Sequence, residues 1–320
     1  MLVFTPRAVS IYFLLTWLFV GPMTSQTVCP TQCACHDVTV DCRFRSLSSV
    51  ADIVHLLPPE MEELDLGEND AIVAMNRTSF PLLTRMRRLR LDGCRLRRIE
   101  SRTFENLRMS LELLDLSGNA IRTLDRGAFD GLQTLRRLRL DDNRLTGAGL
   151  PDFAFRGLSL LELRLDYNRL DSLPRLVFND SEITSLNLDN NELSSVNAAT
   201  LSPMQNTLRS LSINRNHGRT LRVAANAFHN FMLRDLSLAS SGLRSLRFLE
   251  DLSSVEVLDV GGNPLGVVQL SWSSGLSLSC REARLAAINL TSIPDAQLSS
   301  FRSARRLDLS ANRISGMHKS

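Results

Sequence analysis

Four of the six cysteines lie close together near the start of the chain, where they could bind zinc or form disulfides. They are Cys29, Cys33, Cys35 and Cys42 in the run CPTQCACHDVTVDC, and His36 is a further potential zinc ligand. Thiols oxidise in the secretory pathway and stay reduced in the cytosol, so the compartment decides between these two chemistries. Two further cysteines, Cys94 and Cys280, stand alone.

The first 25 residues have the features of a secretory signal peptide. Arg7 supplies positive charge, residues 11–20 are apolar, and residues 21–25 are turn-like and mostly small. The apolar run is well short of the ~20 residues that span a membrane, and no later segment comes close to that length. We therefore predict a signal peptide at 1–25, a secreted or extracellular chain without a membrane span, and disulfides in the cysteine-rich segment 26–57.

No residue pattern typical of an enzyme accompanies the cysteines. The five histidines are widely spread, and no serine, cysteine or metal-ligand cluster gathers around any of them in the sequence. A Gly-rich phosphate loop, an HExxH motif and paired carboxylates are absent as well. We predict that the chain is not an enzyme and binds no metal or other cofactor.

Residues 58–320 are built from a repeat of about 24 residues. The pattern L-x-x-L-x-L-x-x-N-x-L recurs from Met61 onward, most clearly in LELLDLSGNAI, LRRLRLDDNRL and ITSLNLDNNEL. We call its asparagine site the ladder position. About eleven copies place it at Asn69, Cys94, Asn119, Asn143, Asn168, Asn191, Asn216, Ser241, Asn263, Ala283 and Asn312.

Each repeat is predicted to contribute one short strand. The leucines of L-x-L point to one side and the intervening residues to the other. With ~24 residues between strands each return is a crossover, so the strands are parallel and the leucines form one interior shared by neighbouring repeats. The ladder asparagine suits the strand end because its amide both donates and accepts hydrogen bonds, which satisfies backbone groups of the turn.

A second apolar position lies in the returning segment of each repeat. Phe104, Phe129, Phe178 and Leu201 follow the ladder position by ten residues, and Phe155 and Phe228 follow it by twelve. A row of phenylalanines can line a ligand pocket, but at repeat spacing it is far more typical of a shared core. We predict that these residues form a spine on the convex side.

The repeats resemble the typical extracellular class of leucine-rich repeats, and the cysteine run resembles the N-terminal cap of that class. Similar proteins include the ectodomains of Toll-like receptors, Slit, chaoptin-type adhesion proteins and the small leucine-rich proteoglycans. The resemblance covers nearly all of the chain after residue 25 and implies an α/β horseshoe with a parallel sheet on its concave face. In similar caps the first cysteine pairs with the third and the second with the fourth, which implies Cys29–Cys35 and Cys33–Cys42.

The C-terminal part departs from this class from about residue 263. The run Asn-Pro-Leu at 263–265, followed by Trp272, resembles the start of a C-terminal cap, but Val267 and Gln269 stand where its cysteines are expected. No C-terminal cap follows. Because an uncapped solenoid end exposes an apolar edge, we expect either a fragment of a longer protein, such as a membrane-anchored one, or an end that a partner covers.

Cys94 and Cys280 are predicted to be buried, unreactive thiols. They are about eight repeats apart, which at ~4.8 Å per strand is ~38 Å, far beyond the ~7 Å that a disulfide spans. Each occupies a core position of its repeat, where a free cysteine behaves as a small apolar residue.

The side chains between the leucines are predicted to face the concave surface, where a partner would bind. In the second to fifth repeats they include the arginines Arg87, Arg88, Arg90, Arg136, Arg137, Arg139 and Arg164. The same stretch carries the acids Asp92, Glu112, Asp115, Asp141, Asp142, Glu162 and Asp166. These charges balance, and the net charge of the chain is only +3. We therefore expect a protein partner, with a glycosaminoglycan less favoured and nucleic acid excluded.

Seven residues of this surface are candidates for partner binding: Arg88, Arg90, Arg137, Arg139, Arg164, Asp166 and Tyr167. A partner with complementary charge would be steered into register, because the arginines lie toward the strand starts and the aspartates toward their ends. Tyr167, the only tyrosine after residue 25, is a candidate hot spot. A self-neutralised surface without a ligand is the simpler alternative for the charged residues.

Three glycosylation sequons begin at Asn76, Asn179 and Asn289, each after the strand of its repeat. Glycans there would lie off the concave sheet and leave it free. We therefore predict an extracellular protein-binding module for recognition or adhesion, similar to a receptor ectodomain. The alternative is a secreted matrix or proteoglycan-like structural protein that binds matrix proteins or glycosaminoglycans.

Overall fold

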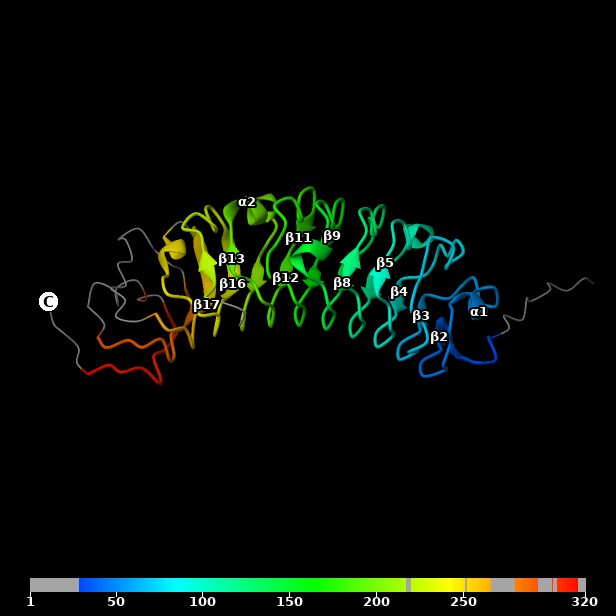
Figure 1. Ribbon diagram of the computed structural model, residues 1–320, viewed down its shortest axis with the longest axis horizontal. Helices are drawn as coiled ribbons and strands as arrows, with labels where there is room; N and C mark the ends of the chain where they lie inside the picture. Colours follow the sequence, from blue (N-terminus) through cyan, green and yellow to red (C-terminus); the bar gives the residue numbers. More distant parts are fainter. Residues whose placement is uncertain are drawn as a thin grey trace, which may run out of the picture.

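The computed structural model describes residues 29–216, 220–250, 252–265, 280–292, 301 and 304–315. The predicted signal peptide, Val267, Gln269 and Trp272 lie outside these ranges. The described chain forms a curved solenoid in which successive repeats lie side by side from the N-terminal cap onward (Figure 1). The predicted repeat solenoid is confirmed.

One sheet runs through the whole solenoid. Among the described residues it has 13 strands, of which two, β1 (Ala34–His36) and β2 (Thr39–Asp41), belong to the cap and pair antiparallel, which leaves eleven from the repeats. These are β3 (Glu63–Asp65), β4 (Arg88–Arg90), β6 (Leu113–Asp115), β8 (Arg137–Arg139), β10 (Glu162–Arg164), β12 (Ser185–Asn187), β14 (Ser210–Ser212), β16 (Met232–Ser237), β17 (Ser254–Asp259), β18 (Glu282–Arg284) and β19 (Arg306–Asp308). Each pairs parallel with the next, and β2 pairs parallel with β3.

The strand register corrects one predicted ladder position. Ala283 pairs with Leu258 on one side and Leu307 on the other, so it occupies the central leucine site of β18. The ladder position of this repeat is Ile288, four residues after the strand end. The prediction was wrong because an alanine in place of the central leucine obscures the repeat pattern at this point.

In the part of the chain that the structure describes, the cap and the returning segments contain only short elements besides the main sheet. Three two-stranded parallel sheets form there: β5 (Arg98–Ile99) with β7 (Thr123–Leu124), β9 (Ser159–Leu160) with β11 (Glu182–Ile183), and β13 (Ser195–Val196) with β15 (Arg222–Val223). The helices are single turns: α1 (Ala51–Val54), α2 (Ala198–Leu201), η1 (Glu105–Leu107), η2 (Gly147–Gly149), η3 (Ser202–Met204) and η4 (Arg247–Leu249). α2 lies on the outer, convex side (Figure 1). Among the described helices, none is long and apolar enough to cross a membrane.

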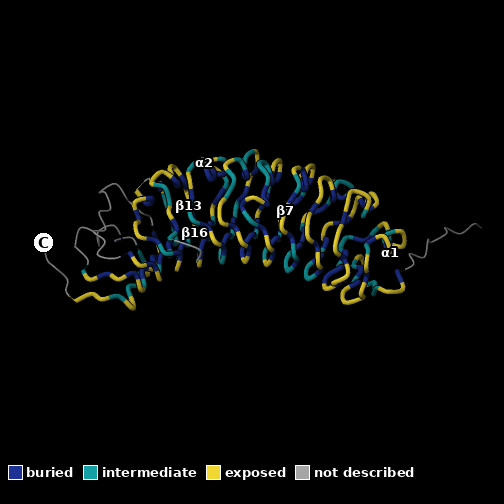
Figure 2. The backbone as a smooth tube through the Cα atoms, viewed as in Figure 1, coloured by how far each residue is buried: buried dark blue, intermediate teal, exposed yellow. Residues whose placement is uncertain are grey.

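The phenylalanine spine is confirmed and begins one repeat earlier than predicted. Phe80, Phe104, Phe129, Phe155 and Phe178 follow one another with ring centroids 5.8–6.3 Å apart, and the last four rings are stacked nearly parallel. Leu201 interrupts the row, after which Phe228 packs edge-on against Phe231 and Phe248. Buried residues run along the inside of every turn between two exposed surfaces (Figure 2).

The ladder asparagines join each repeat to the one before it. Asn119 is typical: its Nδ2 donates to the backbone oxygens of Leu91 (2.8 Å), Leu116 (3.0 Å) and Ser117 (3.1 Å), and its Oδ1 accepts from the N–H of Leu96 (3.0 Å). Leu91 and Leu96 belong to the preceding repeat. The amide therefore satisfies buried backbone groups of two repeats at once, as predicted from its dual hydrogen-bonding capacity.

At the three ladder positions without asparagine, an N–H of the preceding repeat that an asparagine Oδ1 bonds elsewhere has a backbone acceptor instead, although Oγ of Ser241 still accepts from the N–H of Asn216 (3.4 Å). Before Cys94, the N–H of Ile72 already bonds to the backbone oxygen of Asn69 (3.0 Å). Before Ser241, the N–H of Leu221 bonds to the backbone oxygen of Ser241 itself (3.1 Å). Before Ile288, the N–H of Leu265 bonds to the backbone oxygen of Asn263 (2.8 Å). A longer or altered connection thus removes the requirement for an amide.

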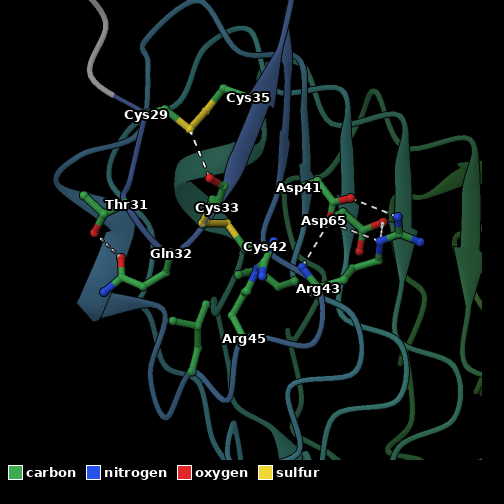
Figure 3. Close-up of a disulfide and its surroundings, with 12 residues drawn as sticks. Cys29, Thr31, Gln32, Cys33, Cys35, Asp41, Cys42, Arg43, Arg45 and Asp65 are labelled. Carbon is green, nitrogen blue, oxygen red and sulfur yellow. Dashed lines mark hydrogen bonds and ion pairs between the residues drawn. A yellow bond between two sulfur atoms is a disulfide. The ribbon is translucent and has the colours of Figure 1, made fainter.

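The N-terminal cap is closed by two disulfides with the predicted pairing (Figure 3). Cys29 is bonded to Cys35 and Cys33 to Cys42, so these sulfurs are not zinc ligands. Cys42 is fully buried, and its backbone oxygen accepts a hydrogen bond from Nδ2 of Asn69 (2.9 Å). The second disulfide therefore fixes the cap directly to the first repeat.

Loss of the Cys33–Cys42 disulfide should destabilise the N-terminal end of the solenoid. Closing a loop of this length contributes about 2–3 kcal/mol, so the double variant Cys33→Ala/Cys42→Ala should lose at least that much unfolding free energy. The measurement is urea denaturation under non-reducing conditions. The variant Cys29→Ala/Cys35→Ala is the matched control and should lose less, because that pair lies farther from the first repeat; equal losses would contradict the role of Cys42.

Candidate partner-binding site on the concave face

The candidate residues lie on neighbouring strands of the repeat sheet. Arg88 and Arg90 are in β4, Arg137 and Arg139 are in β8, and Arg164 is in β10. Asp166 and Tyr167 directly follow β10. The register places Arg90 beside Asp115, Asp115 beside Arg139, and Arg139 beside Arg164. The predicted lateral row is therefore present.

Ion pairs connect this row across the strands. Arg88 and Arg90 both pair with Glu63, at 3.0 and 3.3 Å. Arg139 pairs with Asp115 at 3.4 Å, and the Asp115 side chain is almost fully buried. Sequence analysis placed the opposite charges on this face but did not identify Glu63, which belongs to the first repeat. The arginines are thus held in position by carboxylates of neighbouring repeats.

Arg164 is the most firmly held arginine of the site. Its Nε and Nη2 donate to the two carboxylate oxygens of Asp166 at 3.1 and 2.8 Å, and Nη2 lies 3.5 Å from Asp141. This bidentate bond to Asp166, which is 2% exposed, raises the pKa of Arg164 above its usual range. Burial raises the pKa of Asp141, while the charge of Arg164 opposes that shift. The guanidinium is therefore fixed and always charged.

Three buried polar atoms of this charged cluster lack a hydrogen-bond partner among the described residues. They are Nε of Arg90, Nε of Arg139 and Oδ1 of Asp141. An unpaired buried polar atom costs about 1–3 kcal/mol. A binding partner that reorders this cluster and completes its hydrogen bonds would recover part of that cost.

Tyr167 is an exposed aromatic residue at a backbone position that disfavours it. Tyr167 is 55% exposed, and its backbone φ of +53° lies in the left-handed region. The corresponding turn positions of other repeats include Gly93, Gly118 and Gly262, which suit this conformation. The Tyr167 N–H donates to the backbone oxygen of Asp189 (2.9 Å), which holds the turn in place. The ring contributes little to the core and is available to a partner.

The concave face changes character after the fifth repeat. In β12 and β14 its strand residues are serine and asparagine, and Oδ1 of Asp189 accepts from Oγ of Ser212 (2.7 Å) and the N–H of Asn214 (2.6 Å). Oδ1 of Asn214 in turn accepts from Oγ of Ser237 (2.7 Å). Sequence analysis missed this network; its only sign was an Asp or Asn directly after the last apolar residue of the L-x-L pattern in two successive repeats, Leu188 and Ile213. These groups bond to one another. Charged residues return farther along the sheet, where Arg284 pairs with Asp259 and Glu282, but the exposed aromatic Tyr167 lies beside the charged residues of the second to fifth repeats, which remain the candidate site.

Comparison with known proteins supports the fold of this chain. The leucine rich repeat family model matches residues 84–145, which include β4, β6 and β8. Residues 84–145 therefore consist of leucine-rich repeats, and the chain has the leucine-rich-repeat fold. Its N-terminal disulfides are consistent with a cap of this class. A search of curated proteins found no match.

Two solved structures share the leucine-rich-repeat fold of this chain. A chain of the crystal structure of the TLR13–ssRNA13 complex has a TM-score of 0.67 and 24% identity, and the match covers 82% of this chain but only 38% of that chain. A chain of the octameric complex of Latrophilin 3 (Lec, Olf), Unc5D (Ig, Ig2, TSP1) and FLRT2 (LRR) has a TM-score of 0.68 and 23% identity. That match covers 89% of this chain and 84% of the other.

The sequons of the leucine-rich-repeat chain lie outside the strands of the main sheet. Asn76 and Asn289 are exposed, and Asn179 is partly exposed. Asn76 lies in the connection between β3 and β4, Asn179 precedes β11, and Asn289 follows the ladder position of the repeat of β18. These places agree with glycans kept off the concave sheet, and the glycosylation itself stays a prediction.

The two single cysteines are free and buried, as predicted. Burial raises the pKa of the Cys94 thiol to about 11 and also raises the pKa of Cys280. Sγ of Cys94 donates to the backbone oxygen of Leu66 (3.4 Å), one of the bonds that a ladder asparagine would make. Both thiols stay protonated near neutral pH and belong to the core of the leucine-rich repeats.

Proposed function

We propose that this leucine-rich-repeat chain is an extracellular recognition module that binds a protein partner with the charged part of its concave face. The observation that carries the proposal is the exposed Tyr167 ring beside the fixed Arg164–Asp166 pair. Exposed aromatic and arginine side chains are the residue types enriched at binding hot spots. A rigid sheet presents them without further ordering cost.

The solved neighbours support binding of a macromolecule. One contains FLRT2 (LRR) together with Latrophilin 3 and Unc5D, and the other is a complex of TLR13 with ssRNA. The disulfides of the cap support an oxidising, extracellular compartment. Cell-surface recognition or adhesion is the role that these features favour. Because the TLR13 structure is a complex with ssRNA, the predicted exclusion of nucleic acid is tested separately, by measuring whether this chain binds single-stranded RNA.

Alanine at Tyr167 should weaken partner binding about tenfold or more, as expected for a hot spot. Partners are first captured by proximity labelling with the exported protein, and the affinity of the captured partner is then measured for Tyr167→Ala, Arg139→Ala and Arg164→Ala. Arg126→Ala, an exposed residue of a returning segment, is the control and should bind normally. Unchanged affinity in all three concave variants would place the site elsewhere. If the chain instead binds single-stranded RNA and these substitutions weaken that binding, the partner is a nucleic acid and the proposal of a protein partner is wrong.

A further inference from the structure

Four arginines surround a groove on the flank of the solenoid, where the chain leaves the main sheet. Arg95, Arg97, Arg122 and Arg144 line it together with the small residues Gly118 and Ala120, and it encloses about 480 Å³. Arg97 directly precedes β5, so the groove lies between the turns that end β4, β6 and β8 and the small β5–β7 sheet. We call the groove that these four arginines line the arginine groove.

The arginines of the groove lie in adjacent turns of the chain. The N–H of Arg122 donates to the backbone oxygen of Arg97 (2.9 Å), so these two residues are lateral neighbours. The N–H of Arg144 donates to the backbone oxygen of Ile121 (2.9 Å), which places Arg144 beside Arg122 in the next repeat. Like charges on neighbouring strands or turns repel one another.

Carboxylates do not compensate most of this charge. Arg95 pairs with Asp70 at 3.0 Å, but within the described ranges no carboxylate lies within ion-pair distance of Arg97, Arg122 or Arg144. Arg98, the residue after Arg97, is compensated, because it pairs with Asp125 of the neighbouring repeat at 2.6 Å. The concave face likewise alternates Arg90, Asp115 and Arg139. The repeats can therefore place opposite charges side by side, and they do not do so in the groove.

We infer that the arginine groove binds a sulfated polysaccharide. Sulfate groups keep their negative charge at any physiological pH, and guanidinium groups bind such oxyanions with paired, charge-assisted hydrogen bonds. A bound chain of sulfates would also relieve the repulsion between Arg97, Arg122 and Arg144. No aromatic side chain lines the groove, whereas single-stranded nucleic acids are held largely by stacking on aromatic rings. This favours a polysaccharide over RNA.

This site is separate from the proposed concave site. The balanced charges that argue against a polyanion belong to the concave face, whereas the groove carries unbalanced positive charge on another surface. Tyr167 does not line the groove. Loss of partner binding in Tyr167→Ala and loss of polysaccharide binding in groove variants are therefore distinguishable results.

The test compares two triple variants that remove equal charge. Arg97→Gln/Arg122→Gln/Arg144→Gln alters the groove, and Arg85→Gln/Arg126→Gln/Arg175→Gln alters exposed arginines elsewhere. Affinity for a labelled heparin oligosaccharide is measured at about 0.15 M salt, with the desulfated oligosaccharide and single-stranded RNA as further ligands. The groove variant should bind the heparin oligosaccharide roughly ten- to thirtyfold more weakly than the unmodified chain, and the control variant within about twofold.

Three results would overturn the proposal. They are equal losses in both triple variants, binding that is unaffected by the groove substitutions, and RNA binding of equal strength that depends on the same arginines. Thermal melting of each variant establishes that it is folded. If the groove triple variant melts early, Arg122→Gln alone is measured, with an expected loss of about two- to fivefold and the same overturning results.

Discussion

Replacing Asn143 with alanine is expected to lower the free energy of unfolding by about 3 kcal/mol or more, because several buried backbone groups lose their partner. Nδ2 of Asn143 donates to the backbone oxygens of Leu116 (2.9 Å), Leu140 (3.2 Å) and Asp141 (3.2 Å). Its Oδ1 accepts from the N–H of Ile121 (2.9 Å). Aspartate at this site should be worse, since an oxygen replaces the donor that faces three carbonyl oxygens.

Urea denaturation followed by circular dichroism measures this loss, and amide hydrogen exchange should show reduced protection at Ile121. The matched control is Asn206→Ala, an exposed asparagine for which no side-chain hydrogen bond is present among the described residues. It should change stability by less than about 0.5 kcal/mol. A loss below about 1 kcal/mol for Asn143→Ala would show that water replaces the ladder amide without cost.

Replacing Phe129 with alanine should cost about 3–5 kcal/mol, the usual range for a large side chain removed from a close-packed core. Phe129 is 1% exposed and is stacked between Phe104 and Phe155, with centroids 6.3 Å from each. Neighbouring repeats share this spine, so the cavity would weaken both interfaces of the third repeat.

Two further variants test the cause of that loss. Phe129→Leu should cost clearly less than Phe129→Ala, because Leu201 occupies the same column elsewhere in the solenoid. Phe44→Ala removes a ring that is 70% exposed and should leave the midpoint of thermal unfolding almost unchanged. If Phe129→Ala and Phe44→Ala had similar midpoints, the spine would not be a stabilising element.

The fold was predictable from the sequence because its determinants repeat. The alternation of leucines predicted the parallel sheet, and the chemistry of the asparagine amide predicted its bonds, as at Asn119. The prediction failed locally at Ala283, where an alanine replaces the central leucine and Ile288 replaces the ladder asparagine, so that the residues that mark the register are missing. Periodicity identifies a position only while the side chains that define it are present.

The binding surfaces were less predictable. Period-two alternation assigned Arg90, Asp115 and Arg139 to one face, because that rule holds within a strand. It does not assign a face to Arg97 or Arg144, which lie in returning segments whose lengths and conformations vary. It also did not identify the hydrogen bonds of Asp189 and Asn214, which depend on the distance between neighbouring turns.

The exceptions on the ladder have a consequence for how such chains diversify. At Cys94 and Ile288 the loss of asparagine accompanies a preceding turn that supplies its own acceptor, and at Ser241 the backbone oxygen of the ladder residue accepts instead. The conformation of one turn and the residue at the next ladder position therefore depend on each other. A turn that satisfies its own N–H allows a residue other than asparagine at the ladder position that follows it.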